Sequence, residues 1–276
     1  MKNFLLIVIG FVALLHVVSC SKKAVDDEPQ VEITTPPQGT VDTTQTIFSN
    51  ILGIKMHYSV YLPPSYLKTT EKYPVLYLLH GMYGDYRDWV KNGMASITDL
   101  AIYNAKAKEM VVIMPNGFNA FYCNNFNGGN LKYEDFFIQE FIPQIESKYR
   151  IKATQKGRSI AGLSMGGYGA TYHAFKRPEL FCATYAMSGA IVGTTAPDIK
   201  LLLDARSTDE LKKLPAYTME CGTEDFLVFA GNESFDQYLT NKGIAHNYIK
   251  RTGVHDWIFW KACLPKALEM VSKCLE

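Results

Sequence analysis

The chain alternates between short, continuously apolar runs and longer amphipathic stretches. Residues 51–66, "ILGIKMHYSVYLPPSY", alternate between apolar and polar side chains and predict antiparallel strands that end at Pro63-Pro64. The run "YPVLYLLHG", which ends at Gly81, and the run "MVVIMPNG", at 110–117, are apolar almost throughout. A continuous apolar run closed by a turn residue is typical of a strand that is buried on both faces.

The rest of the chain continues this alternation. Residues 132–150, "KYEDFFIQEFIPQIESKYR", predict a long amphipathic helix, and the short strand "RSIAG" leads directly into a helix that Pro178 ends. The pattern also predicts helices in "ITDLAIYNAKA", near Thr208–Lys213, in "ESFDQYLTNKG" and in "WIFWKACLPKALEMVSKCL", and strands in "FCATYAMSG", "AYTMECG" and "AHNYIKR". We therefore expect residues 44–276 to form a single α/β domain, with a mostly parallel central sheet and helices on both faces.

An apolar run, "FLLIVIGFVALLHVVS", follows a short charged start and occupies positions 4–19. The run is shorter than a membrane-spanning helix requires and is typical of a secretory signal. Because "VVSC", which ends at Cys20, resembles a bacterial lipobox, we interpret residues 1–19 as a lipoprotein signal peptide and Cys20 as the lipidated residue. The alternatives are an ordinary signal peptide or a core helix.

Residues 20–43 are rich in proline, threonine and charge and have no helical period, which predicts a flexible tether. The acidic cluster Asp26-Asp27-Glu28 resembles the surface-export signal of Bacteroidetes lipoproteins, and a plain charged linker explains it equally well. We expect the protein to be secreted and held by its lipid on the outer membrane, at the periplasmic or the cell-surface face.

Charge and cysteine content narrow the function further. With 28 basic and 27 acidic residues the net charge is +1, and no basic stripe stands out, so nucleic acid is not an expected partner. Cys182 and Cys221 lie in apolar runs, where buried thiols are expected, and the sequence does not determine which cysteines, if any, form a disulfide. No metal site is expected, because C-x-x-C spacing is absent among the cysteines after Cys20, which are Cys123, Cys182, Cys221, Cys263 and Cys274.

The segment "IAGLSMGGYGAT", residues 160–171, places Ser164 between Gly162 and Gly166. It lies where a buried strand ends and a helix begins, as a nucleophile elbow requires. The N-terminus of that helix favours developing negative charge. A phosphate-binding loop, the competing interpretation, would carry a lysine or glycines at other offsets. We therefore interpret Ser164 as a nucleophile.

A serine hydroxyl needs a base to take its proton, and three histidines follow Ser164. His173 lies inside the helix that leaves the elbow, and His246 lies in a strand pattern. His255 falls in a loop between the last strand and the last helix, where an imidazole can lie over the carboxyl edge of the sheet. We expect His255 to be the base.

The base in turn needs an orienting acid. Where the serine lies on a nucleophile elbow, the acid follows the serine and precedes the histidine along the chain. Glu224 and Asp225 follow a buried strand, and we choose Asp225 with Glu224 as the reserve. Asp256 would be badly placed to bind the neighbouring imidazole, and Asp198 and Asp204 do not lie at a strand end.

An oxyanion hole requires two backbone N–H groups aimed at the reacting carbonyl oxygen. One is expected from Met165, the residue after the nucleophile. The other is expected from Met82, in the loop "LLHGMYGD", where Gly81 lets the chain turn. We interpret His80 as a residue that supports this turn rather than as a base.

Five segments, "VLYLLHGMYGD", "VVIMPNG", "IAGLSMGGYGA", "ECGTEDFL" and "GVHDWIFW", resemble the esterase D-like α/β-hydrolases in order and spacing. That family includes feruloyl, acetylxylan and tributyrin esterases, S-formylglutathione hydrolases and enterochelin-esterase-like proteins. The resemblance runs from about Phe48 to the C-terminus. It implies an α/β-hydrolase fold with Ser164, Asp225 and His255 as the catalytic triad, and it does not imply a single substrate.

The loop "NGFNAFYCNNFNGGN", residues 116–130, interleaves aromatic side chains with amides. Phe121 and Tyr122 in this loop, and Trp257 after the candidate base, are the candidate substrate-binding residues. Packing of the loop onto the domain explains its aromatic residues equally well. No long insertion suggests a lid, which favours an open site for a bulky ester.

The expected function is that of an extracytoplasmic serine esterase that removes acetyl or feruloyl groups from polysaccharide or related small esters through an acyl-enzyme, with no metal or cofactor. One alternative is an acyltransferase that uses the same triad. Another is a non-catalytic carbohydrate-binding lipoprotein, which the intact triad and oxyanion positions disfavour. The sequence predicts no oligomeric state.

Overall fold

The computed structural model describes residues 35–276. Its strands are β1 Thr40–Ser49, β2 Ile54–Leu62, β3 Val75–Leu79, β4 Val111–Pro115, β5 Arg158–Leu163, β6 Ala183–Met187, β7 Ala216–Gly222 and β8 Asn247–Arg251. Its α-helices are α1 Asp88–Lys91, α2 Met94–Tyr103, α3 Tyr133–Asp135, α4 Ile142–Lys148, α5 Met165–Lys176, α6 Ile199–Asp204, α7 Thr208–Leu211, α8 Phe229–Asn241 and α9 Trp257–Ser272. The 3-10 turns η1 Phe126–Gly128 and η3 Gln155–Gly157 and the π-helical segment η2 Phe136–Phe141 complete the set.

The strands form one sheet in the order β1-β2-β4-β3-β5-β6-β7-β8. β1 and β2 are antiparallel to each other, β2 is antiparallel to β4, and every pair from β4 to β8 is parallel. The predicted α/β class and mostly parallel sheet are confirmed. Because the six parallel strands point the same way, the loops after their carboxyl ends meet at one edge of the sheet, where sites form in such folds.

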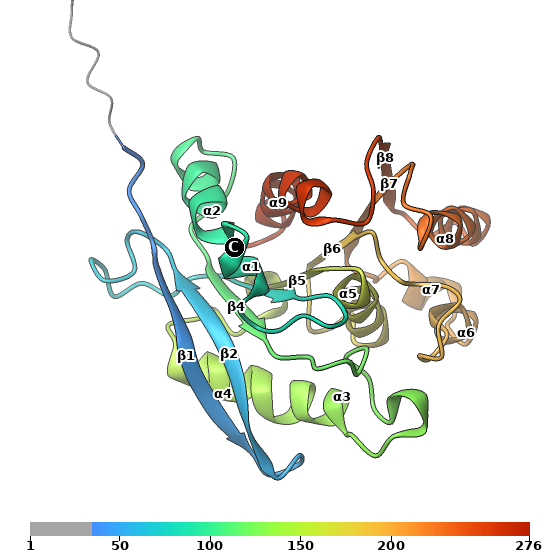
Figure 1. Cartoon of the computed structure of the whole chain (residues 1–276), viewed down its shortest axis with the longest axis horizontal. Coiled ribbons are helices and arrows are strands. Elements are labelled where there is room, and N and C mark those ends of the chain that lie inside the picture. Colours follow the sequence, from blue (N-terminus) through green and yellow to red (C-terminus); the bar gives the residue numbers. More distant parts are fainter. Residues whose placement is uncertain (1–34) are drawn as a thin grey trace, which may run out of the picture. The chain divides into compact units, whose positions relative to one another are not determined.

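Successive residues of β3 enter opposite layers of the core, because side chains alternate across a strand. Tyr77 packs in a cluster with Phe137 and Phe141 of η2, on the face that α4 and α5 cover. Leu76 and Leu78 pack in a second cluster together with side chains of α2 and α9. Figure 1 shows α2 and α9 on one side of the sheet and α4 and α5 on the other. Burial on both faces explains why this strand is apolar throughout.

β1 begins at Thr40, so the expected boundary of the tether at residue 43 is wrong by four residues. Thr40 pairs with Leu62 of β2, and the Gly39 N–H donates to Asp99 Oδ1 at 2.9 Å. The start of β1 is a half-exposed edge strand, so its polar residues show no alternation that a sequence pattern could reveal. The expected signal peptide and the lipidation at Cys20 lie outside the described residues.

The predicted helix at 132–150 is divided into α3, η2 and α4. Pro143, near the start of α4, has no N–H to continue the regular α-helical ladder, and the preceding turn is π-helical. Along residues 35–276, no helix is both long and apolar enough to cross a membrane.

A disulfide joins Cys182, just before β6, to Cys274, just after α9. The expectation of a buried free thiol at Cys182 is therefore wrong. Its partner lies 92 residues away and comes close only because α9 packs back against β6, which no local pattern reveals. Cys221 is a buried free thiol, as expected.

Candidate active site

Ser164 occupies a strained turn between β5 and α5. Its backbone has φ 52° and ψ −117°, a conformation that non-glycine residues rarely adopt, and its N–H donates to Met187 O at 2.8 Å. A Cβ on Gly162 would lie 2.3 Å from Gly166 O, and a Cβ on Gly166 would lie 2.5 Å from Leu79 O. The flanking glycines are therefore required by close backbone contacts, and the turn presents the serine at the edge of the sheet.

Ser164, His255 and Asp225 form one chain of hydrogen bonds. His255 Nδ1 lies 2.7 Å from Asp225 Oδ2, and His255 Nε2 lies 2.8 Å from Ser164 Oγ. Because an ionised carboxylate only accepts hydrogen bonds, Nδ1 carries the imidazole proton and donates it to Asp225. Nε2 is then left as the acceptor of the serine O–H. This arrangement can remove the proton of Ser164.

Two loops hold the acid and the imidazole in register. The Thr223 N–H donates to Arg251 O at 2.9 Å, and the Glu224 N–H donates to Gly253 O at 3.1 Å, so the loop after β7 is tied to the loop after β8. Asp225 is 1% exposed and bonds His255, whereas Glu224, the alternative acid, is exposed.

The other candidate acids and histidines lie elsewhere. Asp256 caps α9 by accepting the Phe259 N–H at 2.9 Å. His173 is buried in α5, where burial lowers its pKa to about 4, and its Nε2 lies 2.8 Å from Tyr122 O. His246 Nε2 bonds to Asp236 at 2.8 Å. None of these groups contacts the serine.

The expected oxyanion donors, the N–H groups of Met82 and Met165, have no hydrogen-bond partner among residues 35–276. Met165 is the first residue of α5, so its N–H is one of the free donors that every helix leaves at its N-terminus. Met82 lines the same cavity as Ser164. Unpaired backbone donors beside a nucleophile can bind an oxygen that gains negative charge.

A cavity of about 290 Å³ opens beside the serine. Trp257, a candidate substrate contact, lines it, and so does Trp260, which packs edge-on to the His255 ring at 5.0 Å between centroids. Gly81 and Met82, which the sequence indicated, also line the cavity. The other lining residues, which the sequence did not indicate as part of the site, are Tyr83, Asp88, Leu163 and Leu227.

Phe121 and Tyr122 do not line this cavity, so the expectation that they contact substrate is corrected. Phe121 is 5% exposed and Tyr122 is fully buried. The Tyr122 ring packs against Tyr133, and its hydroxyl donates to His80 O at 3.0 Å. Both residues adopt positive φ angles, 49° and 56°, which the sequence did not indicate.

A buried ionic network that sequence reasoning missed lies next to the relay. Glu220 of β7 is fully buried and pairs with Arg251 of β8 and with Lys266 of α9. Burial opposes ionisation of Glu220, but hydrogen bonds from Lys266, Tyr185 and Arg251 outweigh it and keep the pKa of this carboxyl below its usual value. The network links the three elements whose loops carry Asp225 and His255.

Known esterases resemble this chain in sequence and in fold. The Esterase family model, described as "Putative esterase", matches residues 49–271. An acetyl esterase of Caldicellulosiruptor saccharolyticus is 29% identical over 235 residues, which cover 74% of this chain and 85% of that protein. An endo-1,4-beta-xylanase/feruloyl esterase of Xylanibacter ruminicola is 29% identical over 239 residues, which cover 83% of this chain and 31% of that protein.

A solved structure of a ferulic acid esterase superposes with a TM-score of 0.79 and 34% identity, and the match covers 87% of this chain and 99% of that one. The family match runs from the end of β1 into α9 and so includes the whole relay and the cavity. With its α/β-hydrolase fold, the chain belongs to this esterase family and is a carboxylic ester hydrolase.

Proposed function

We propose that this protein is a serine esterase that works through an acyl-enzyme on Ser164, outside the cytoplasm, and that it removes acetyl or feruloyl groups from polysaccharide or related small esters. The observation that carries the mechanism is the relay from Ser164 Oγ through His255 to Asp225, with bonds of 2.8 and 2.7 Å. The unpaired N–H groups of Met82 and Met165 beside it supply the electrostatic part of the site.

In the first half-reaction, Ser164 Oγ attacks the ester carbonyl carbon while its proton moves to His255 Nε2. The carbonyl π pair moves onto oxygen, and the two N–H groups stabilise that oxyanion. When the tetrahedral intermediate collapses, the C–O bond to the alcohol breaks and His255 gives its proton to the leaving oxygen. The products are the free alcohol and an acyl group bound to Ser164.

In the second half-reaction, water takes the position of the alcohol. His255 accepts one proton from the water, the hydroxide adds to the acyl carbon, and the bond to Ser164 Oγ breaks as the proton returns to that oxygen. The carboxylic acid leaves and the serine is regenerated. Asp225 stays ionised throughout and stabilises the imidazolium that forms in each half.

The residues that line the cavity support the proposal that the acyl group is acetyl or feruloyl. Trp257, Trp260, Leu163 and Leu227 line it, which suits a small or planar apolar acyl group better than a charged one. The relatives named acetyl esterase and feruloyl esterase point to the same two groups.

Export is supported by the disulfide between Cys182 and Cys274, since disulfides persist mainly in oxidising compartments. It agrees with the secretory signal expected at 1–19 and with the lipid anchor expected at Cys20. Globomycin, which blocks lipoprotein signal processing, tests the anchor. It should make the precursor accumulate in producing cells, and an unchanged mature form would contradict the anchor.

A substrate panel tests the reaction. Purified protein is assayed with p-nitrophenyl acetate, methyl ferulate and acetylated xylan, alongside the Ser164→Ala variant. We expect hydrolysis of at least one ester and its loss in the variant, and the ratio among the esters identifies the acyl group. Equal rates in both proteins would contradict the serine mechanism, and transfer of the acyl group to an added sugar in preference to water would favour an acyltransferase.

A further inference from the structure

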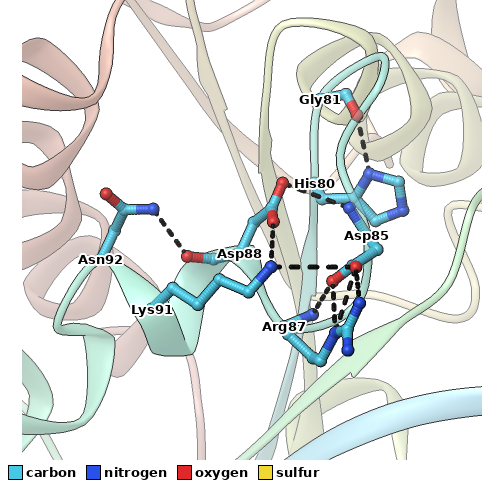
Figure 2. A network of polar contacts seen from close by, with 7 residues as sticks. All are labelled: His80, Gly81, Asp85, Arg87, Asp88, Lys91 and Asn92. Atoms are coloured by element: carbon cyan, nitrogen blue, oxygen red, sulfur yellow. Dashed lines mark hydrogen bonds and ion pairs between the residues drawn. The ribbon is translucent and has the colours of Figure 1, made fainter.

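We propose that His80 is a positioning residue for the oxyanion hole, holding the Gly81–Met82 peptide so that the Met82 N–H faces the reacting carbonyl. This inference rests on the proposed esterase mechanism. Figure 2 shows the His80 ring turned back onto the carbonyl of Gly81, within the loop that connects β3 to α1.

The backbone determines which nitrogen of His80 carries the proton. The Gly117 N–H points at His80 Nε2 at 2.8 Å, and an N–H can only donate, so Nε2 accepts. The proton of the neutral ring is therefore on Nδ1, which donates to Gly81 O at 2.7 Å. The ring is 1% exposed, and this burial lowers the pKa of His80, which favours the neutral ring that both bonds require.

The bond to Gly81 O fixes the orientation of the next N–H. The carbonyl of Gly81 and the N–H of Met82 belong to the same peptide unit, which is planar and trans, so they point in opposite directions. Gly81 O is held on its side by His80 Nδ1 and by the Gly84 N–H at 3.3 Å. The Met82 N–H therefore points the other way and has no partner among residues 35–276.

The same bond strengthens the donor. A hydrogen bond to a peptide carbonyl polarises the amide, which makes the attached N–H a better donor to a developing oxyanion. Without the bond from His80, the Gly81–Met82 peptide could rotate about its flanking torsions, and the alignment of its N–H would be lost when charge develops on the substrate oxygen.

The aromatic loop behind His80 keeps the ring in place. The Tyr122 hydroxyl donates to His80 O at 3.0 Å, and the two rings meet edge to face at 5.8 Å between centroids. A Cβ on Gly117 would lie 2.4 Å from the Tyr122 ring, so the loop that donates to Nε2 has no space to move in that direction. The positive φ angles at Phe121 and Tyr122 are the backbone strain that this support entails.

The test compares two amides at position 80. His80→Asn places an amide N–H where Nδ1 is and keeps the donation to Gly81 O, whereas His80→Gln extends to the position of Nε2 and loses it. Because loss of an oxyanion donor costs about 10²–10³ in kcat, a misaligned donor in His80→Gln should cost about 10- to 100-fold. We expect KM to stay within about twofold and His80→Asn to recover most of kcat.

A second readout separates positioning from folding. The affinity for a trifluoromethyl ketone, which forms a tetrahedral oxyanion on the serine, should fall by the same factor as kcat/KM in His80→Gln. The control is His246→Gln, because His246 Nδ1 also bonds a backbone carbonyl, Ile244 O at 2.8 Å, away from the cavity. It should leave kcat and inhibitor affinity unchanged.

The outcomes distinguish the two proposals. If Ser164→Ala keeps its turnover, the proposed esterase mechanism fails. If Ser164→Ala is inactive, the esterase mechanism stands and the His80 variants test the second proposal. The role of His80 is overturned if folded His80→Gln keeps the kcat and inhibitor affinity of the wild type, or if its kcat falls no further than that of His80→Asn. If His80→Gln does not fold, Tyr122→Phe decides, because it removes only the hydroxyl that holds His80 O. A severalfold lower kcat with constant KM supports the proposal, and an unchanged kcat overturns it.

Discussion

The imidazoles of His255, His173 and His80 differ in what surrounds them rather than in chemistry. His255 has a carboxylate on one nitrogen and a hydroxyl on the other, and its side chain is 17% exposed, so it can exchange protons with substrate and water. The other two are buried and bond backbone groups, and burial lowers the pKa of each. A buried neutral imidazole is suited to holding structure, and only His255 is placed to act as a base.

The choice of acid can be tested by exchanging neighbours. Asp225→Asn removes the charge that orients and stabilises the imidazole, so we expect kcat to fall by about 10²- to 10⁴-fold. Glu224→Gln is the matched control, because Glu224 is exposed, and it should stay within about twofold of the wild type. Steady-state kinetics on p-nitrophenyl acetate measures both. A larger loss in Glu224→Gln than in Asp225→Asn would reverse the assignment.

His173 makes stability depend on pH. Its folded pKa, about 4, lies below the unfolded value near 6.5, so the unfolded chain binds more protons between these values. The stabilisation is complete above the unfolded pKa and is lost as pH falls toward the folded one. Between pH 7 and pH 5 we expect a loss of about 2 kcal/mol in the free energy of unfolding from this residue.

Urea unfolding at the two pH values measures this loss against His173→Gln, whose amide is neutral at both and can still donate to Tyr122 O. The variant should lack this part of the pH dependence. An identical pH dependence in both proteins would show that His173 does not contribute.

At the scale of elements, the turn between β5 and α5 depends on absent side chains. A Cβ on Gly166 would meet Leu79 O and His80 O at 2.5 and 2.6 Å, both backbone atoms that cannot rotate away. We expect Gly166→Ala to destabilise the fold by about 1–3 kcal/mol and to lower kcat by displacing the loop after β3.

Gly231→Ala is the matched control for this substitution. Gly231 lies in α8, and its nearest neighbour would be Val192 Cβ at 3.4 Å, an ordinary contact. The free energy of unfolding of this variant should rise by about 0.5–1 kcal/mol, because alanine has a higher helix propensity than glycine. Urea unfolding measures the stability of both variants. Equal changes in Gly166→Ala and Gly231→Ala would show that the close contacts at the turn do not affect stability.

The buried strands were predictable because burial on both faces leaves an uninterrupted apolar run, as in β3 and β4. The elements that the sequence did not reveal lack such a signal. The start of β1 is a polar edge, the π-helical segment η2 is a local change within an amphipathic pattern, and α6 is a short surface helix.

For the whole molecule, the disulfide joins the start of β6 to the end of the chain across 92 residues. Closing a loop of that length in the unfolded state stabilises the fold by about 4.6 kcal/mol in the chain-entropy description. We expect the double variant Cys182→Ala/Cys274→Ala to lose about this much in urea unfolding. Dithiothreitol should destabilise the wild type and not the variant, and no difference between them would contradict the bond.

Chain order and strand ends were enough to select Ser164, Asp225 and His255, because parallel strands bring their carboxyl ends to one edge of the sheet. The residues that line the cavity could not be predicted in the same way. Trp260, which the pattern places only within the predicted last helix, lines the cavity, whereas Tyr122, a candidate contact, is buried. Which face of a loop residue meets a cavity depends on long-range packing that a local pattern does not contain.

The proposed mechanism requires that an acyl group be transferred to Ser164, and acid quenching during turnover of p-nitrophenyl acetate traps that group on the protein. Mass spectrometry of the digested protein should find one acetyl group on the peptide that contains Ser164. The Ser164→Ala variant should carry none and should release no p-nitrophenol above the uncatalysed rate. An acetyl group on a different residue of the wild type, or undiminished turnover in the variant, would rule out Ser164 as the nucleophile.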